Sequence, residues 1–144
     1  MYAGGSTGLA TLRRDGFASM DADTKGGVLT TVPVIFKGKC PFVNIAARDG
    51  ELCTELLDAD GHVIAPFSRG NSVSVKADST HQRITWQGVA DLSALAGKPV
   101  RFRFHLTNGQ LYAFWVGPDE NGASNGYVAA GGPGFSGATD TTGK

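Results

Sequence analysis

Hydrophobic and polar residues alternate with a period of two along most of the middle of the chain. The alternating runs are short, and turn-forming pairs such as Asp49-Gly50 and Asn108-Gly109 separate them. The runs predicted to form strands are 8–12, 16–21, 27–31, 34–36, 41–47, 51–57, 73–76, 82–86, 100–106 and 110–116. Many short strands at this spacing predict an all-β fold, an antiparallel β-sandwich of the jelly-roll-like kind.

The stretch 100–116 has the strongest hairpin pattern, because an Asn-Gly pair separates two alternating runs. The register this predicts has a buried face and an outward face. The buried pairs are Leu106 with Leu111, Phe104 with Ala113 and Phe102 with Trp115. The outward pairs are His105 with Tyr112 and Arg103 with Phe114. The same periodicity places Trp86 and Trp115 chiefly in the interior.

A second hairpin is predicted to turn at Asp49-Gly50. The buried pairs would be Val43 with Leu56, Ile45 with Thr54 and Ala47 with Leu52, with Asn44 and Glu55 on the polar face. This register places Cys53 opposite Ala46 and leaves Cys40 distant, which favours two free thiols; a disulfide needs a different register. The helical pattern is limited to a turn or two at 91–95, with Asp91 as N-cap and Gly97 as the stop.

The length of 144 residues fits one domain. We expect a lead-in linker at 1–7, the β-sandwich module at 8–125 and a glycine-rich C-terminal tail at 126–144. Thirteen basic residues balance thirteen acidic ones without a basic stripe, which argues against nucleic acid as a partner. No apolar run is long enough to span a bilayer, and no leader follows Met1, so we expect no membrane association and any secretion signal to lie elsewhere.

The outward face of the first hairpin is the best candidate for a binding site. Sugars bind proteins by laying CH groups on aromatic rings while polar side chains exchange hydrogen bonds with the hydroxyls. Arg103, His105, Tyr112 and Phe114 form such a set if this face is open. The alternative is that another domain or the tail covers the face, with Arg103 stacked on Phe114.

Metal and catalytic patterns are weak. His62, His81 and His105 lie on different elements, away from zinc-ligand spacing. Asp21 and Asp23 can offer carboxylates to a structural calcium ion, with an ordinary polar turn as the alternative, and no other cofactor is expected. No GxSxG elbow is present, and the few Glu residues do not suggest the carboxylate pair of a glycosidase. We therefore do not expect an enzyme.

Several segments resemble one known group of proteins. They are LRRDGFASM at 12–20, GELCTELLDADG at 50–61, FSRGNSV at 67–73, DSTHQRITWQG at 78–88, and then DLSALAGKPVRFRFHL and LYAFWV. From about residue 8 to 135 the chain resembles the C-terminal β-sandwich that follows a five-bladed β-propeller in bacterial proteins similar to family 32 glycoside hydrolases and their sialidase-like relatives. Cys40 and Cys53 depart from this pattern, in which other residues are usual.

The resemblance implies that the catalytic carboxylates belong to a propeller, and that the sandwich either braces the propeller or binds carbohydrate. We therefore predict a non-catalytic accessory module of a secreted or periplasmic glycoside hydrolase. Its partners would be a polysaccharide or oligosaccharide and the N-terminal catalytic domain of the parent protein. The alternatives are a structural domain that braces the propeller without a ligand of its own, and, third, an independent hydrolase.

Overall fold

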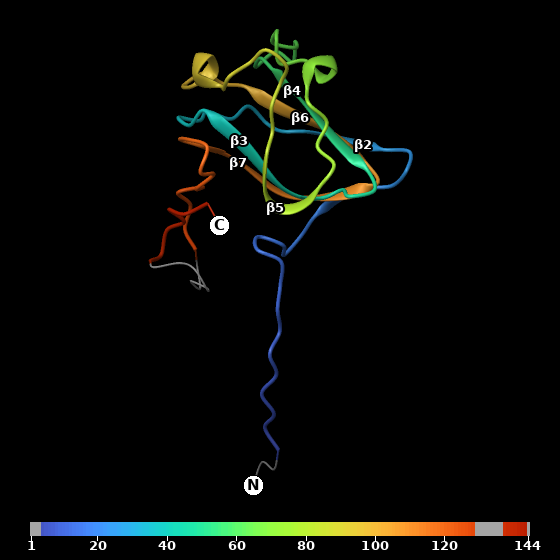
Figure 1. The fold of residues 1–144 in the computed structure, drawn as a ribbon, viewed down its shortest axis with the longest axis vertical. Coiled ribbons are helices and arrows are strands. Elements are labelled where there is room, and N and C mark those ends of the chain that lie inside the picture. The colour runs from blue at the N-terminus through green and yellow to red at the C-terminus, as the bar shows by residue number, and fades with distance from the viewer. Residues whose placement is uncertain (1–3, 129–136, 144) are drawn as a thin grey trace.

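The computed structural model describes residues 4–128 and 137–143, which form two packed antiparallel sheets (Figure 1). The strands are β1 (Met20–Ala22), β2 (Gly27–Thr30), β3 (Cys40–Ala46), β4 (Glu51–Leu57), β5 (Asp78–Arg83), β6 (Arg101–Thr107) and β7 (Gly109–Gly117). Sheet A has the order β1-β7-β3-β5, and sheet B has the order β2-β6-β4. The predicted β-sandwich is confirmed.

Neither predicted hairpin forms. β3 and β4 lie in different sheets, and so do β6 and β7. Instead β3 pairs with β7 and β4 pairs with β6, from Cys40 opposite Gly117 to Leu57 opposite Arg101. The four strands therefore form one long two-stranded ribbon that folds over itself, so that its halves enter the two sheets. Both hairpin registers were wrong, because the chain bends from one sheet to the other at 47–50 and at Asn108.

Glycines let the two bends of this ribbon cross closely. A Cβ atom at Gly50 would lie 2.0 Å from the carbonyl oxygen of Thr107, and one at Gly109 would lie 2.7 Å from the Cβ of Ala47. Asn108 has a φ of 47° and donates a side-chain hydrogen bond to the Asp49 carbonyl over 3.0 Å. The Asp-Gly and Asn-Gly pairs thus serve two crossing corners instead of two tight hairpin turns.

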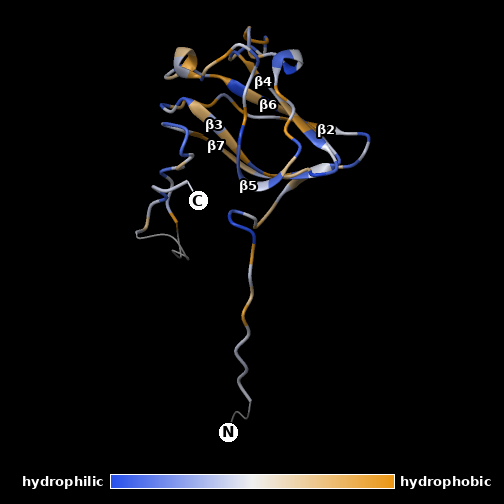
Figure 2. Cartoon of the chain, in the orientation of Figure 1, coloured by the Kyte–Doolittle hydropathy of each residue, from blue (hydrophilic) through white to orange (hydrophobic). Residues whose placement is uncertain are grey.

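The core lies between the sheets, and Figure 2 shows hydrophobic residues along β3, β4 and β6. Phe102, Phe104 and Leu106 alternate inward along β6, as the period of two predicts. Trp86 is 4% exposed, and its indole nitrogen donates to the Thr54 carbonyl over 2.9 Å, so its predicted interior position is confirmed.

Several predicted elements are shorter or displaced. Residues 8–12 form no strand, 16–21 contributes only the beginning of β1, and 82–86 overlaps β5 by two residues. The runs 34–36 and 73–76 supply single bridges, Val34 to Val100 and Val75 to Leu52. The predicted helical turn is a 3-10 turn at Ser93–Leu95, where Asp91 accepts the Ser93 amide hydrogen bond.

Both cysteines are free thiols, as the sequence favoured, although Cys53 lies opposite His105 and not opposite Ala46. Burial raises the pKa of the Cys40 thiol. Within 4–128 and 137–143 there is no helix long and apolar enough to cross a membrane.

Candidate functional site

The four predicted sugar-binding residues do not share a face. Arg103 and His105 lie on β6 in sheet B, whereas Tyr112 and Phe114 lie on β7 in sheet A. The prediction of one aromatic and polar face was wrong, because it depended on a β6–β7 hairpin that does not form.

A β-bulge at Tyr112 changes the direction of every side chain after it on β7. Leu111 pairs with Ile45 and Ala113 pairs with Asn44, which leaves Tyr112 as the extra residue. One inserted residue flips the remaining side chains to the other face. Phe114 therefore packs in the core, 5.2 Å from the ring centres of both Phe102 and Phe104.

The same shift corrects the prediction for Trp115, which lies on the outer face of sheet A. Its ring stacks on Phe42 at 5.7 Å, and its indole nitrogen donates to the Gly122 carbonyl over 2.9 Å. His81 stacks on the same Phe42 ring at 4.7 Å. Gly122, in the C-terminal segment of residues 119–128 and 137–143, lies against this aromatic cluster, because a Cβ atom there would lie 1.5 Å from His81 Nε2.

On the outer face of sheet B, Arg103 and His105 both hydrogen-bond the carboxylate of Glu55. The Arg103 guanidinium lies 3.2 Å and the His105 Nε2 atom 3.0 Å from Glu55 Oε1. Burial by itself raises the pKa of Glu55, but the hydrogen bonds from His105, Arg103 and the Arg69 amide outweigh it and lower that pKa. These polar groups satisfy one another, and neither Tyr112 nor Phe114 lies beside them to stack on a sugar.

The outer face of sheet A carries a row of side chains that crosses all four strands. Asp21 on β1 pairs with Gln110 on β7, Gln110 with Ala46 on β3, and Ala46 with Asp78 on β5. The small Ala46 side chain lies between longer polar neighbours, so the middle of the row is low. This row is the floor of a hollow of about 360 Å³, which we call the corner groove.

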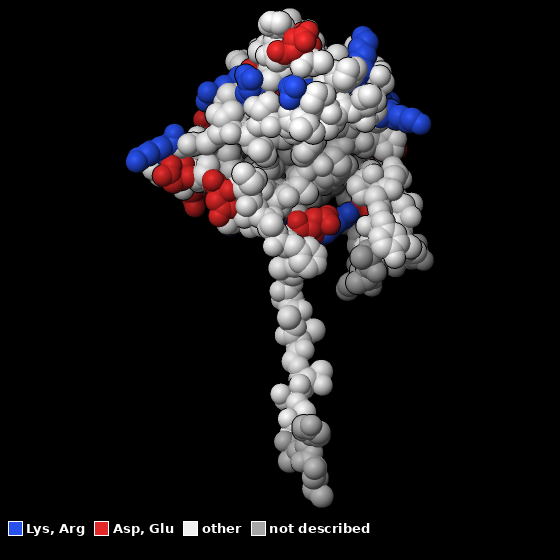
Figure 3. All heavy atoms as spheres, turned by 180° about the vertical axis from the view of Figure 1, so that it is seen from behind, with Lys and Arg blue, Asp and Glu red and all other residues white. Residues whose placement is uncertain are grey.

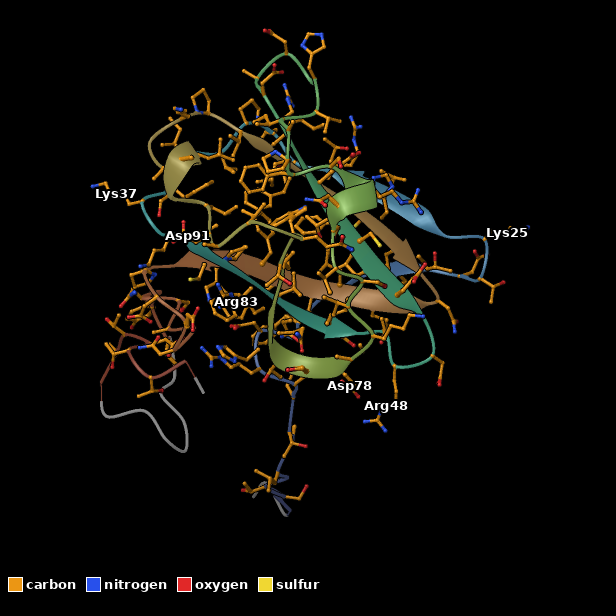
Figure 4. The ribbon with its side chains drawn as sticks, turned by 45° about the horizontal axis from the view of Figure 1, so that its top comes forward. Lys25, Lys37, Arg48, Asp78, Arg83 and Asp91 are labelled. Carbon is orange, nitrogen blue, oxygen red and sulfur yellow. The ribbon has the colours of Figure 1, made fainter. Side chains whose placement is uncertain are left out.

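The walls of the corner groove are polar and of mixed charge. Besides the row, its lining consists of Ala22, Arg48, Asp49, Asn108 and Gly109, which come from the end of β1 and from the two crossing corners. Arg48 and Asp78 project from the same end of the molecule, far from Lys37 and Asp91 (Figure 4). Carboxylate, amide and guanidinium groups that converge over a small-residue floor can accept and donate hydrogen bonds to several hydroxyl groups at once.

Tyr112 and Arg13 border this groove. The Tyr112 hydroxyl donates to Gln110 Oε1 over 2.8 Å, and the Arg13 guanidinium lies 4.8 Å from the centre of the Tyr112 ring. Arg13 also donates to Asp78 Oδ1 over 2.5 Å. A tight turn holds Arg13 here: Asp15 has a φ of 48°, and the Gly16 amide donates to the Arg13 carbonyl over 2.9 Å.

Asp140 anchors the C-terminal segment beside the Arg13 turn. Its carboxylate is 1% exposed and accepts hydrogen bonds from Arg14, from the amide and hydroxyl of Ser124, and from the amides of Thr142 and Gly143. Within the expected tail, residues 126–128 therefore pair with residues 137–143, through hydrogen bonds from the Asp140 amide to the Gly126 carbonyl and from the Val128 amide to the Ala138 carbonyl, and Asp140 ties them to Arg14. The rest of that tail falls outside the described residues.

The two aspartates considered for calcium are engaged in local hydrogen bonds. Asp21 accepts from Ser19 and Gln110, and Asp23 accepts from the Lys25 amide. In the part of the chain that the structure describes, one group of three Asp and His side chains lies within reach of a single ion. It consists of Asp58, Asp60 and His62, and it includes neither Asp21 nor Asp23. Calcium at Asp21 and Asp23 stays a prediction without further support.

Sequence reasoning identified Tyr112 but missed its neighbours. The LRRDGF segment stood out only through a resemblance, and no pattern assigned Arg13 a contact with β3, β5 and β7. Ala46, Asp78 and Gln110 come together through strand pairings between segments far apart in the chain. Because both predicted hairpins were local, they could not place these residues side by side.

Comparisons with known proteins do not add an identity: no family model, curated protein or solved structure matches the chain.

Proposed function

We propose that the chain is a non-catalytic accessory module of a secreted or periplasmic carbohydrate-active protein, and that it binds polysaccharide or oligosaccharide weakly in the corner groove. The observation that carries the proposal is the row Asp21–Gln110–Ala46–Asp78, a low floor between hydrogen-bonding side chains. The resemblance to the sandwich that follows a glycoside hydrolase propeller gives the proposal its biological setting. The binding face differs from the one that the sequence predicted.

The ligand that fits the groove is a saccharide with adjacent hydroxyl groups. Asp21 and Asp78 accept hydrogen bonds from hydroxyls, whereas Arg48 and the amides of Asn108 and Gln110 donate to ring and hydroxyl oxygens. The hollow is open, and the described residues that line it include no aromatic side chain, so little apolar area is buried per sugar ring. We expect dissociation constants on the order of millimolar to high micromolar.

We predict that Ala46→Leu abolishes glycan binding, because the larger side chain fills the floor of the groove. Ala46 is only partly buried and points away from the core, so the variant should fold normally. The measurement is retention of the purified chain on a panel of insoluble polysaccharides and a glycan array. Lys37→Ala, at the other end of the molecule, is the matched control. If the chain is not retained by any glycan, or if Ala46→Leu is retained like the parent chain, the proposal is wrong.

A second candidate function is a structural brace against a neighbouring domain, the N-terminal catalytic domain of the parent protein. It rests on the exposed apolar side chains between residues 9 and 35: Leu9, Leu12, Phe17, Met20, Val28, Val32 and Ile35. Leu9 is 94% and Phe17 92% exposed. The N-terminal arm, residues 4–12, carries no charged residue and projects from the body (Figures 1 and 3). Large apolar side chains left exposed in this number are typical of a surface that another protein covers.

The brace predicts that the isolated chain self-associates through these side chains. Replacing Leu9 and Phe17 together by serine should leave the melting temperature within about 1 °C, because both side chains already face solvent. The same change should convert concentration-dependent association, measured by light scattering, into a monomer. A parent chain that remains monomeric at high concentration removes the support for the brace.

A further inference from the structure

Arg13 occupies a binding site built by other parts of the chain. Its Nε atom donates to Asn44 Oδ1 over 2.6 Å, its two terminal nitrogens donate to Asp78 and to the Ile45 carbonyl, and its guanidinium lies over the Tyr112 ring. Asn44 is fully buried and yet polar. An aromatic face, a buried amide, a carboxylate and a backbone carbonyl thus converge on one planar group.

The same four groups are what an aromatic sugar subsite requires. Tyr112 offers a ring on which a pyranose or furanose face can stack, and Asp78 and Asn44 offer acceptors for its hydroxyl groups. The subsite is continuous with the corner groove, because Asp78 lines both and the Tyr112 hydroxyl is bonded to Gln110 of the groove floor. The Arg13 guanidinium lies over the Tyr112 ring, beside the groove.

We propose that Arg13 is an internal competitor that masks an aromatic saccharide subsite formed by Tyr112, Asn44 and Asp78, and that withdrawal of the N-terminal arm unmasks it. The inference rests on the proposed function, since it extends the corner groove by one sugar ring. In this subsite Tyr112 supplies the aromatic ring that the described lining of the groove lacks.

The connection of Arg13 to the arm supplies a way to withdraw it. Residues 4–12 form no strand and are exposed throughout, and they precede Arg13 directly. A neighbouring domain that binds Leu9 and Leu12 would pull on the residue that covers Tyr112. Docking of the arm and opening of the subsite would then be coupled, because both act on the same few residues of backbone.

The test is isothermal titration of the full chain and of Arg13→Ala with oligosaccharides built from glucose, fructose or xylose. Removal of the guanidinium should tighten binding of the oligosaccharide that the chain recognises by roughly threefold to tenfold, the range that one aromatic contact supplies. Arg13→Gln is a second variant in case Arg13→Ala does not fold. Its side-chain amide can still donate a hydrogen bond to Asn44, but it carries no charge to place over the Tyr112 ring. Arg83→Ala is the matched control, because it removes another ion-paired arginine, which lies on β5 of sheet A and is bonded to Glu120.

The double variant Arg13→Ala/Tyr112→Ala separates this inference from the proposed function. If the subsite exists, the double variant loses the gain and returns to the affinity of the parent chain or below it. If the parent chain binds a glycan and both Arg13 variants bind it no more tightly, the masked subsite is refuted while the corner groove stands. If neither the parent chain nor the variants bind any oligosaccharide, both proposals fail. Binding by the Arg13 variants alone supports the masked subsite and contradicts binding by the corner groove of the parent chain.

Discussion

Gly50→Ala should lower the melting temperature of the protein by roughly 6–12 °C. A Cβ atom here would lie 2.0 Å from the Thr107 carbonyl oxygen and 2.2 Å from that of Asn108, well inside contact distance. Both oxygens belong to the opposite corner of the folded ribbon, so relief requires the two corners to move apart. A backbone clash of this kind costs about 2–4 kcal/mol, and for a domain of this size each kcal/mol shifts the melting temperature by about 3 °C.

The control is Gly70→Ala, because an added Cβ there meets no atom within 4 Å and the backbone needs no left-handed conformation. Thermal unfolding followed by circular dichroism compares the two variants. Equal melting temperatures for Gly50→Ala, Gly70→Ala and the parent chain would contradict the crossing of the corners, and with it the ribbon topology.

Asp140→Ala should release the C-terminal segment from the outer face of sheet A. The substitution removes the acceptor for Arg14, Ser124, Thr142 and Gly143, in a site where the carboxylate is 1% exposed. Loss of one partner from a buried, hydrogen-bonded charge costs about 3–5 kcal/mol. Because Trp115 donates to Gly122 of this segment, release should shift tryptophan emission to longer wavelength and speed proteolysis within residues 119–143.

Asp119→Ala is the control for this variant, since Asp119 is exposed on the same segment and accepts a hydrogen bond only from the Asn121 amide among the described contacts. It should leave both the emission spectrum and the rate of proteolysis unchanged. An Asp140→Ala protein that resists protease like the parent chain would show that the segment is held by other contacts.

The attachment should also depend on pH in a defined direction. Burial by itself raises the pKa of Asp140, but hydrogen bonds from Ser124, Arg14 and Gly143 outweigh it and hold that pKa far below its usual value. A carboxyl group whose pKa is lowered on folding stabilises the folded form above its unfolded pKa, near 4, and loses that contribution as the pH falls below it. The segment should therefore stay attached at pH 5 and above and loosen only in strong acid.

The fold class was predictable from the sequence, whereas the pairing of the strands was not. Alternation placed Phe102, Phe104 and Leu106 correctly on the inner face of β6. It could not show that Asn108-Gly109 turns the chain into the other sheet, because a tight hairpin and a sheet-crossing corner favour the same residues. The choice between them depends on contacts with the distant corner at Gly50.

The site was predictable only in part, for a related reason. Tyr112 points outward as expected, but the bulge at this residue has no signature in the sequence and reverses Phe114 and Trp115. Arg103 and His105 do face outward, as alternation predicted, yet they are joined to Glu55 across the β4–β6 pairing. The periodicity of a strand fixes which residues share its face, but not which other strand completes that face.

The most direct test of the central claim is chemical-shift mapping of the ¹⁵N-labelled chain with the oligosaccharide that it binds most tightly. If the corner groove is the binding site, the largest shifts fall on the amides of Ala46, Asp78, Asn108 and Gln110, and those of Arg103 and His105 on the opposite sheet stay in place. Shifts centred on Arg103 and His105, or the absence of any shift with every saccharide tested, would contradict the account.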